Sequence, residues 1–119
     1  KFDSKTEHDF SFVLENDTKV LRWIRPAREQ FSIYWSNGSK RYEPDFIVET
    51  VKRIYMVETK AANELSSDDV MMKKKAAEEY CRHASEFTLE NGGKQWSYIL
   101  VPHDRVERTT SFDYLIATR

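Results

Sequence analysis

Asp45, Glu58 and Lys60 are the side chains of this chain whose types could perform hydrolytic chemistry together. Two carboxylates can hold Mg²⁺, a hard cation that prefers oxygen ligands and often uses only one or two carboxylates. Such a cation cancels charge on phosphoryl oxygens and lowers the pKa of a bound water. A neighbouring ammonium can hold or help to deprotonate that water and stabilise charge in the transition state. The three residues therefore suit hydrolysis of a phosphodiester, provided that the fold brings them together.

The stretch 42–60 contains these residues and predicts two strands joined by a tight turn, because both halves are rich in β-branched and aromatic residues. Side chains alternate along a strand, so Glu58 and Lys60 should share a face. If the turn lies near 51–52, Asp45 comes roughly opposite Glu58. The hairpin would then gather two carboxylates and one ammonium at one end.

Pro44, directly before Asp45, bears on where the first strand can start. Proline has no backbone donor, so Asp45 should lie at a bulge or at a strand start. The segment that enters Pro44 follows an Asn-Gly turn signal at 36–39, and we expect strands on both sides of that segment. A simpler interpretation of the polar residues stays open, in which Glu58 and Lys60 form a surface ion pair and Asp45 is a turn residue.

The same residues carry a resemblance to a known family. Pro-Asp at 44–45, a spacer of about a dozen residues and Glu-Thr-Lys at 58–60 resemble the active-site signature of the PD-(D/E)XK nucleases. The wider context, Tyr-Glu-Pro-Asp-Phe and Val-Glu-Thr-Lys, resembles the C-terminal nuclease domain of the cleavage (Res) subunit of type III restriction enzymes. Two further segments fit the same family, 75–78 and 96–102, and the likeness extends from about residue 6 to about residue 103.

The resemblance implies a fold, an activity and a site. The fold would be α/β, a restriction-endonuclease-like core in which a mixed central β-sheet is flanked by helices. The activity would be that of a Mg²⁺-dependent endodeoxyribonuclease that leaves a 5′-phosphate and a 3′-hydroxyl. Asp45, Glu58 and the backbone carbonyl of Thr59 would bind the metal, and Lys60 would be catalytic. A glutamate of the first helix, here Glu7, would lean into the site and help to orient the metal or its water.

The resemblance also implies partners. Double-stranded DNA would be the substrate, an upstream ATP-dependent helicase or translocase domain would belong to the same chain, and a separate methyltransferase (Mod) subunit would read the DNA. ATP would act only in that motor domain, since 1–119 contains no Gly-rich phosphate loop. The implied location is the bacterial cytoplasm. Two alternatives stay open: a related repair or junction nuclease, and a non-catalytic domain of the same fold that docks DNA or a partner.

Glu7 has a second interpretation, as a helix cap. Ser4 and Glu7 fit a capping box, in which Ser4 is the N-cap and Glu7 reaches back toward it. A helix should follow to about residue 16, and its apolar side chains should be buried: Phe10, Val13 and Leu14. The sequence leaves both roles of Glu7 open.

Lys73, Lys74 and Lys75 form the densest basic run of the chain. Charge runs on a helix are usually a solvated face, which is one interpretation of this run. The other is contact with DNA phosphates, because the helix follows directly on the strand that carries Glu58 and could line a groove for the DNA backbone.

Periodicity and turn signals predict the remaining elements. In a helix at 68–84, Met71 and Met72 should fill gaps in the core, and Cys81 should be a small buried residue. The last strand, 96–101, is apolar enough to be central, and the helix would make a right-handed crossover to it from a parallel neighbour. Other elements are expected as follows: strands at 18–24 and 30–35, and a terminal helix at 109–118 that buries Phe112, Leu115 and Ile116.

Composition bounds the class of protein. The 119 residues allow one domain, and because residue 1 is Lys rather than Met we interpret 1–119 as a piece of a longer chain. The single cysteine, Cys81, cannot form an internal disulfide and indicates a reducing compartment, and the lack of a run of about 18 apolar residues argues against a membrane span. A net charge of −1 is not that of a free-standing nucleic-acid binder, so most of the grip on DNA should come from the rest of the parent protein.

Overall fold

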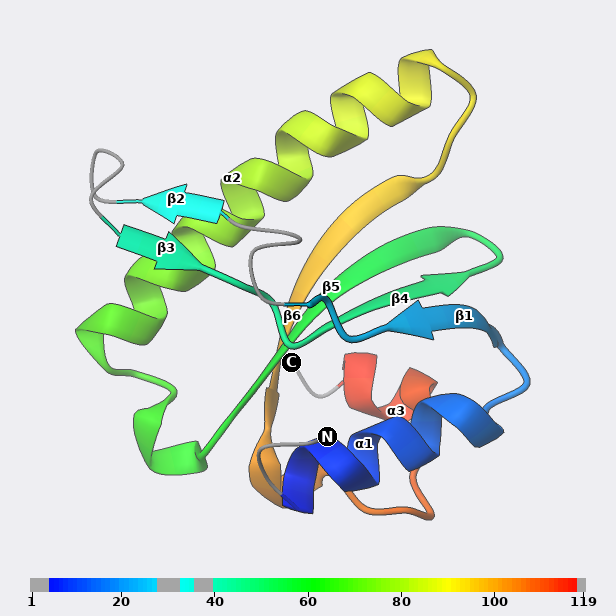
Figure 1. Cartoon of the computed structure of the whole chain (residues 1–119), viewed down its shortest axis with the longest axis vertical. Helices are drawn as coiled ribbons and strands as arrows, with labels where there is room; N and C mark the ends of the chain where they lie inside the picture. The colour runs from blue at the N-terminus through cyan, green and yellow to red at the C-terminus, as the bar shows by residue number, and fades with distance from the viewer. Residues whose placement is uncertain (1–4, 28–32, 36–39, 118–119) are drawn as a thin grey trace.

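The computed structural model describes residues 5–27, 33–35 and 40–117 and has an α/β architecture (Figure 1). The α/β class expected from the sequence is therefore confirmed. Two short 3-10 turns follow β5 and β6, at Ala62–Glu64 and His103–Arg105. In chain order the helices and strands are α1 (Lys5–Asn16), β1 (Val20–Ile24), β2 (Ile33–Trp35), β3 (Lys40–Tyr42), β4 (Phe46–Thr50), β5 (Arg53–Lys60), α2 (Asp68–Glu90), β6 (Gln95–Pro102) and α3 (Phe112–Ala117).

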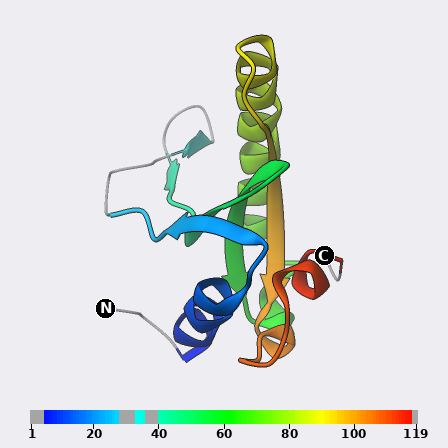
Figure 2. The ribbon, with the colours of Figure 1, turned by 90° about the vertical axis from the view of Figure 1, so that its right-hand side faces the viewer.

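Four of the strands form a mixed sheet in the order β1-β4-β5-β6. β4 pairs antiparallel with both β1 and β5, whereas β5 and β6 run parallel. Parallel neighbours need a long connection, and α2 provides it while packing alongside β6 (Figure 2). The expected mixed sheet and the parallel pair joined by this helix are both confirmed.

β4 and β5 form the predicted hairpin. Phe46 lies opposite Val57, and the chain turns at 51–52. Asp45, one residue before β4, therefore lies across from Glu58 near the end of β5. The predicted position of Asp45 at a strand start is confirmed.

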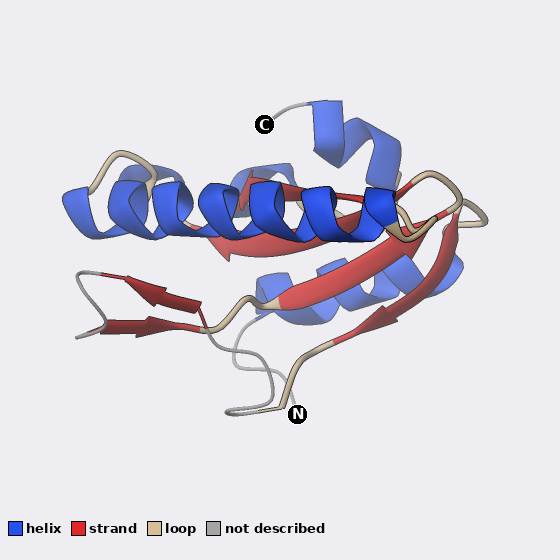
Figure 3. Ribbon diagram, turned by 90° about the horizontal axis from the view of Figure 1, so that it is seen from above, coloured by secondary structure: helices blue, strands red, loops and turns tan. Residues whose placement is uncertain are grey.

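The segment that enters Pro44 differs from the expectation. Tyr42 ends β3, and β4 begins only at Phe46, so 42–50 is not one strand. Among the described strands β3 pairs only with β2, and the two lie beside α2, apart from the larger sheet (Figure 3). Pro44 accounts for the break, because its missing N–H cannot join a ladder. The turn expected at 36–39 lies outside the described residues.

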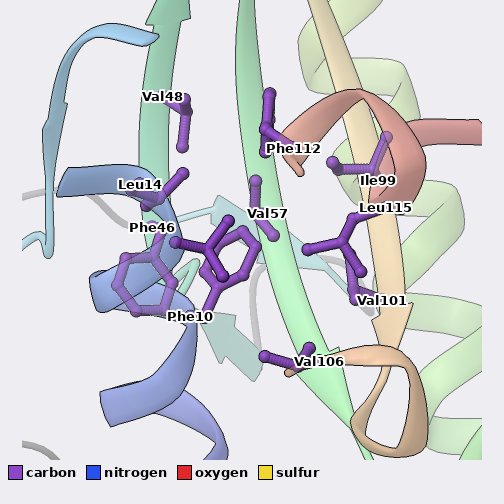
Figure 4. Packing of buried hydrophobic residues seen from close by; sticks show 11 residues of the cluster. Phe10, Leu14, Phe46, Val48, Val57, Ile99, Val101, Val106, Phe112 and Leu115 are labelled. Carbon is purple, nitrogen blue, oxygen red and sulfur yellow. The ribbon is translucent and has the colours of Figure 1, made fainter. Parts of the chain in front are cut away.

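Alternation along the strands produces an apolar cluster on each face of the sheet. One cluster joins α1 and α3 to the strands (Figure 4): Phe10, Val13, Leu14, Phe46, Val48, Val57, Ile99, Val101, Val106, Phe112 and Leu115. The other joins α2 and the β2–β3 pair to the opposite face: Ile33, Tyr42, Met56, Ala77, Cys81 and Tyr98. Glu58 and Lys60 alternate in phase with Met56, so their side chains lie on the α2 face.

The two terminal helices agree with the sequence to different degrees. α1 covers the expected range and buries Phe10, Val13 and Leu14, while the proposed N-cap, Ser4, lies outside the described residues. α3 is shorter than expected and starts at Phe112. It buries Phe112 and Leu115 fully. Ile116, which we expected to be buried as well, is only partly buried.

Asp17 holds the start of α3 from a distance in the sequence. Its Oδ2 accepts a hydrogen bond from the Phe112 N–H at 2.8 Å, and its Oδ1 accepts one from the Lys19 N–H at 2.9 Å. A carboxylate that accepts from the first backbone N–H groups of a helix satisfies donors that have no partner inside the helix. The loop after α1 is thereby tied to α3.

α2 begins after Ser67, whose hydroxyl oxygen accepts a hydrogen bond from the Val70 N–H at 3.3 Å. The helix continues to Glu90, well past the expected end at 84. No proline or glycine interrupts it before Gly92, which has a positive φ of 77° and suits the turn that follows. The sequence did not predict this extension, because the apolar side chains of the last turns, Phe87 and Leu89, are exposed and do not continue the buried stripe.

Burial on α2 corrects one expectation and confirms another. Met71 and Met72 have 47% and 49% of their surface exposed, so they do not fill gaps in the core. Cys81 is buried as expected, and burial raises the pKa of its thiol to about 12. The side chains that face inward are smaller than the two methionines: Val70, Ala77, Cys81 and Ser85.

β6 lies at the edge of the sheet, not at its centre as we expected. Its apolar residues reflect helices that cover both faces, not strands on both sides. On the side away from β5, the Ser85 hydroxyl donates to the Trp96 carbonyl oxygen at 3.1 Å and accepts from the Trp96 N–H at 2.9 Å. α2 therefore takes up two main-chain groups of this edge strand.

Candidate active site

Asp45 is held in place by the backbone and side chain of β5. Its N–H donates to the Val57 carbonyl oxygen at 3.1 Å. Its Oδ2 accepts from the Thr59 N–H at 2.9 Å and from the Thr59 hydroxyl at 3.2 Å. The carboxyl is thus fixed at the open end of the hairpin, and the structure assigns Thr59 a contact that the sequence did not predict.

Glu58 and Lys60 meet on one face, as alternation predicted. The Lys60 Nζ lies 3.7 Å from the Glu58 Oε2, and the exposed fractions of the two side chains are 29% and 8%. Glu58 is therefore a buried carboxyl, not a member of an exposed surface pair. The simpler interpretation of these residues as a solvated ion pair with a turn aspartate is wrong in this respect.

Two tyrosines line the inner side of Glu58. Tyr42 at the end of β3 and Tyr98 on β6 are both buried. The Tyr42 hydroxyl oxygen and the Glu58 Oε1 are buried without a hydrogen bond of good geometry within the described part of the chain. They nevertheless lie close enough for the Tyr42 hydroxyl to lower the pKa of Glu58. The Tyr42 hydroxyl is therefore a close polar neighbour of the buried Glu58 carboxyl.

Burial controls the electrostatics of the two carboxyls. Burial, and next the charge of Asp45, raise the pKa of Glu58 to about 8, against the opposing effects of Lys60, Tyr42 and Lys73. Burial also raises the pKa of Asp45, although the hydrogen bonds from Thr59 oppose it. At neutral pH the Glu58 carboxyl therefore holds a proton that a bound cation could displace.

Glu7 lies near the site but has a different neighbour from the one expected. The Arg25 Nη2 lies 2.6 Å from the Glu7 Oε1, and the exposed fractions of the two side chains are 25% and 12%. Arg25 is close enough to Asp45 to lower the pKa of that carboxyl. Glu7 is thus connected to the site through Arg25.

The three lysines of α2 differ in their relation to the site. Lys73 is half-buried and close enough to Glu58 to lower the pKa of that carboxyl. Lys74 is half-buried and lines a cavity of about 560 Å³ beside β6, together with Met71 and Tyr98. Lys75 is exposed. The expected basic run is therefore divided between the site and the surface.

The donor set fits Mg²⁺ better than a transition metal. Within residues 5–27, 33–35 and 40–117 no group of three or more His, Cys, Asp and Glu side chains could hold a metal ion. Asp45 and Glu58 nevertheless provide two carboxylates, and Mg²⁺ often needs no more because it keeps several waters.

Sequence reasoning found Asp45, Glu58 and Lys60 but missed Arg25 as a neighbour of the site. The first three follow from strand alternation and one short turn, both of which are local. Arg25 comes directly after β1 and before Pro26, where nothing in the sequence relates it to Glu7.

No protein-family model, curated protein or solved structure matches this chain. Within the described residues, no helix combines the length and apolarity that crossing a bilayer requires.

Proposed function

We propose that this chain is a Mg²⁺-dependent endodeoxyribonuclease domain that hydrolyses phosphodiester bonds of double-stranded DNA. One observation carries the proposal: the half-buried carboxyl of Asp45 and the buried carboxyl of Glu58 lie across from each other at the end of a hairpin, with the Lys60 ammonium 3.7 Å from Glu58. A purely structural role gives no reason to place two carboxyls next to each other where burial and the charge of Asp45 together raise the pKa of Glu58.

The residues divide the work of hydrolysis. Water adds to phosphorus, the bond from phosphorus to the 3′-oxygen breaks, and the products are a 5′-phosphate and a 3′-hydroxyl that takes up a proton. Mg²⁺, when bound, would neutralise charge on the phosphate and acidify water. Asp45 and Glu58 would hold the ion. Thr59 would fix the Asp45 carboxyl through its N–H and hydroxyl, and the Thr59 backbone carbonyl would be a further oxygen ligand. Lys60 would donate hydrogen bonds to the attacking water and to the charge that develops on phosphate.

The wider assignment rests on the sequence resemblance. We propose a restriction-endonuclease-like core for the α/β fold, and a role as the cleavage domain of a type III restriction enzyme. In that role a helicase or translocase domain would use ATP, and a methyltransferase (Mod) subunit would select the DNA, in the bacterial cytoplasm. The mixed sheet with its antiparallel hairpin and parallel crossover supports the coarse part of this assignment.

The test compares Asp45→Asn and Glu58→Gln in the full-length protein with Glu90→Gln as a control. Glu90 is exposed at the far end of α2, so its amide should leave cleavage unchanged. We expect each site variant to lose at least about 100-fold in plasmid cleavage with Mg²⁺, because a metal ligand is removed. Isothermal calorimetry should show weaker Mg²⁺ binding, and circular dichroism should show an intact fold.

Wild-type cleavage rates in Asp45→Asn, or undiminished wild-type cleavage in excess chelator, would overturn the proposal. The alternative of a non-catalytic docking domain makes a different prediction. The wild type would then cleave nothing with Mg²⁺ or Mn²⁺, and both site variants would lose binding to DNA or to a partner.

A further inference from the structure

Arg25 occupies a place beside the proposed metal ligands that no sequence motif marks. It follows the last residue of β1 and reaches Glu7 on α1, with 2.6 Å between Arg25 Nη2 and Glu7 Oε1. Three quarters of its side-chain surface is buried, and the Glu7 side chain is 12% exposed. The ion pair therefore differs from an exposed pair, whose long side chains move freely and contribute little.

The guanidinium of Arg25 is also placed with respect to Asp45. Its central carbon lies 5.8 Å from the centre of the Phe46 ring, and Phe46 directly follows Asp45 in the chain. The charge of Arg25 reaches the Asp45 carboxyl, where it favours the ionised form. The guanidinium thus has Glu7 and Asp45 as neighbouring carboxyls, and it stacks toward an aromatic ring of the core.

The charges at this end of the hairpin suit an anion. The ammonium of Lys60 and the guanidinium of Arg25 both lie close enough to Asp45 to favour its ionised form, and part of each cation is exposed, 29% and 25% of the side chain. A guanidinium is a planar fork whose N–H groups match the oxygens of a phosphate, and an ion pair with a carboxylate fixes the plane of the fork. Glu7 is in the position to provide that fixation.

We propose that Arg25 binds a backbone phosphate of the DNA substrate and that Glu7 orients the Arg25 guanidinium instead of the metal. This inference rests on the proposed nuclease function. It assigns Arg25 as a substrate-binding residue and Glu7 as a positioning residue. It also accounts for a glutamate of the first helix near the site without making it a metal ligand.

The experiment measures DNA binding and metal binding separately in the full-length protein. Duplex DNA affinity is measured in chelator over a range of salt concentrations, for Arg25→Gln, Arg25→Lys and the control Arg22→Gln. Arg22 is on β1 as well, but its side chain is 79% exposed and pairs with Glu49. Each phosphate contact contributes to the slope of log affinity against log salt, and we expect Arg25→Gln to reduce that slope by about one.

Arg25→Lys and Glu7→Gln separate the effect of charge from the effect of the orientation of the guanidinium. Arg25→Lys keeps the charge and can keep the pair with Glu7, so the salt slope should remain while kcat/KM falls several-fold for lack of the fork. This variant also serves if Arg25→Gln fails to fold. Glu7→Gln should weaken DNA binding and raise KM, and its Mg²⁺ affinity by calorimetry should equal that of the wild type.

Several results would overturn the inference. The first is a salt slope of Arg25→Gln that equals the slope of Arg22→Gln. The second is a lower melting temperature of Arg25→Gln with unchanged DNA binding, which would mean that Arg25 only stabilises the packing of α1 against β1. Weaker Mg²⁺ binding by Glu7→Gln would show that Glu7 contributes to metal binding, against the inference. The salt slope, the melting temperature and the Mg²⁺ affinity need no turnover, so these three readouts stay informative if the Asp45→Asn test rejects the nuclease function.

Discussion

Glu58 is a carboxyl in which burial and charge oppose each other. Its side chain is 8% exposed, one of its oxygens has no hydrogen bond of good geometry in the described part of the chain, and the charge of Asp45 lies nearby. Lys60 compensates only in part, because burial raises the pKa of Glu58 to about 8 in spite of it. The carboxyl is therefore neutral in the metal-free protein over most of the acidic and neutral range.

This property predicts how stability depends on pH without metal. The pKa of Glu58 is about 8 in the folded chain and 4.5 as the ordinary value, so the folded state binds a proton more tightly than the unfolded state. The contribution is fully present below the ordinary pKa and is lost as pH rises through the folded pKa. We expect the free energy of unfolding in chelator to fall by on the order of a few kcal/mol between about pH 5 and about pH 9.

The comparison with Glu58→Gln isolates this one group, since glutamine cannot titrate. Urea unfolding across the pH series should give a flatter profile for Glu58→Gln, and Glu90→Gln should keep the wild-type profile because Glu90 is exposed. Identical pH profiles for wild type and Glu58→Gln would show that this carboxyl is not buried in the protein.

How far single residues can be predicted from sequence depends on how local their contacts are. Asp45 and Glu58 come together through one short turn and the alternation of side chains, and sequence alone relates them. Arg25 and Glu7 meet across 18 positions of chain and through the packing of α1, and no periodicity encodes that distance. The contact of Thr59 with Asp45 depends on the orientation of the Thr59 amide near the end of β5, which the sequence does not specify.

Among the elements, α3 depends on a residue far from it. Asp17 accepts hydrogen bonds from the N–H groups of Phe112 and Lys19, and Phe112 is fully buried against the core. Replacing Asp17 by Ala should destabilise the chain by about 1 kcal/mol, the usual effect of losing such a cap, whereas Asp17→Asn should retain most of the stability.

Thermal or urea unfolding measures this effect, and Asp104→Ala serves as the control because Asp104 is exposed in a 3-10 turn. A melting temperature of Asp17→Ala that equals the control would mean that the carboxylate does not hold α3.

Element types were easier to predict than the position of each element in the fold. α1, the β4–β5 hairpin and the start of α2 at residue 68 have local signals, and all three are confirmed. Whether β6 is central or at the edge depends on which strand lies next to it, and a strand covered by helices on both faces has the same apolar sequence. Met71 and Met72 are exposed although their neighbour Val70 in the same turn of α2 is buried, and apolar sequence alone does not show which of three adjacent side chains faces the sheet.

At the scale of the whole molecule, charge limits what the chain can do alone. The net charge is −1, and several cations pair with acids: Lys19 with Asp113, Lys94 with Glu49 and Arg82 with Glu79. We expect residues 1–119 alone to bind duplex DNA with a dissociation constant above about 1 μM at physiological salt, without any response to ATP. Fluorescence anisotropy with a labelled duplex measures this, and submicromolar binding would contradict the expectation.

The two hydrogen bonds between Ser85 and Trp96 of β6 bear on the tendency of the protein to aggregate. An edge strand whose N–H and C=O groups are accessible is a template onto which a second chain can add a strand, and so a starting point for aggregation. Ser85 occupies both main-chain groups of Trp96, which closes part of that template. The protection lasts only while α2 is docked, so a partly folded chain with α2 detached would expose a self-complementary edge to its neighbours.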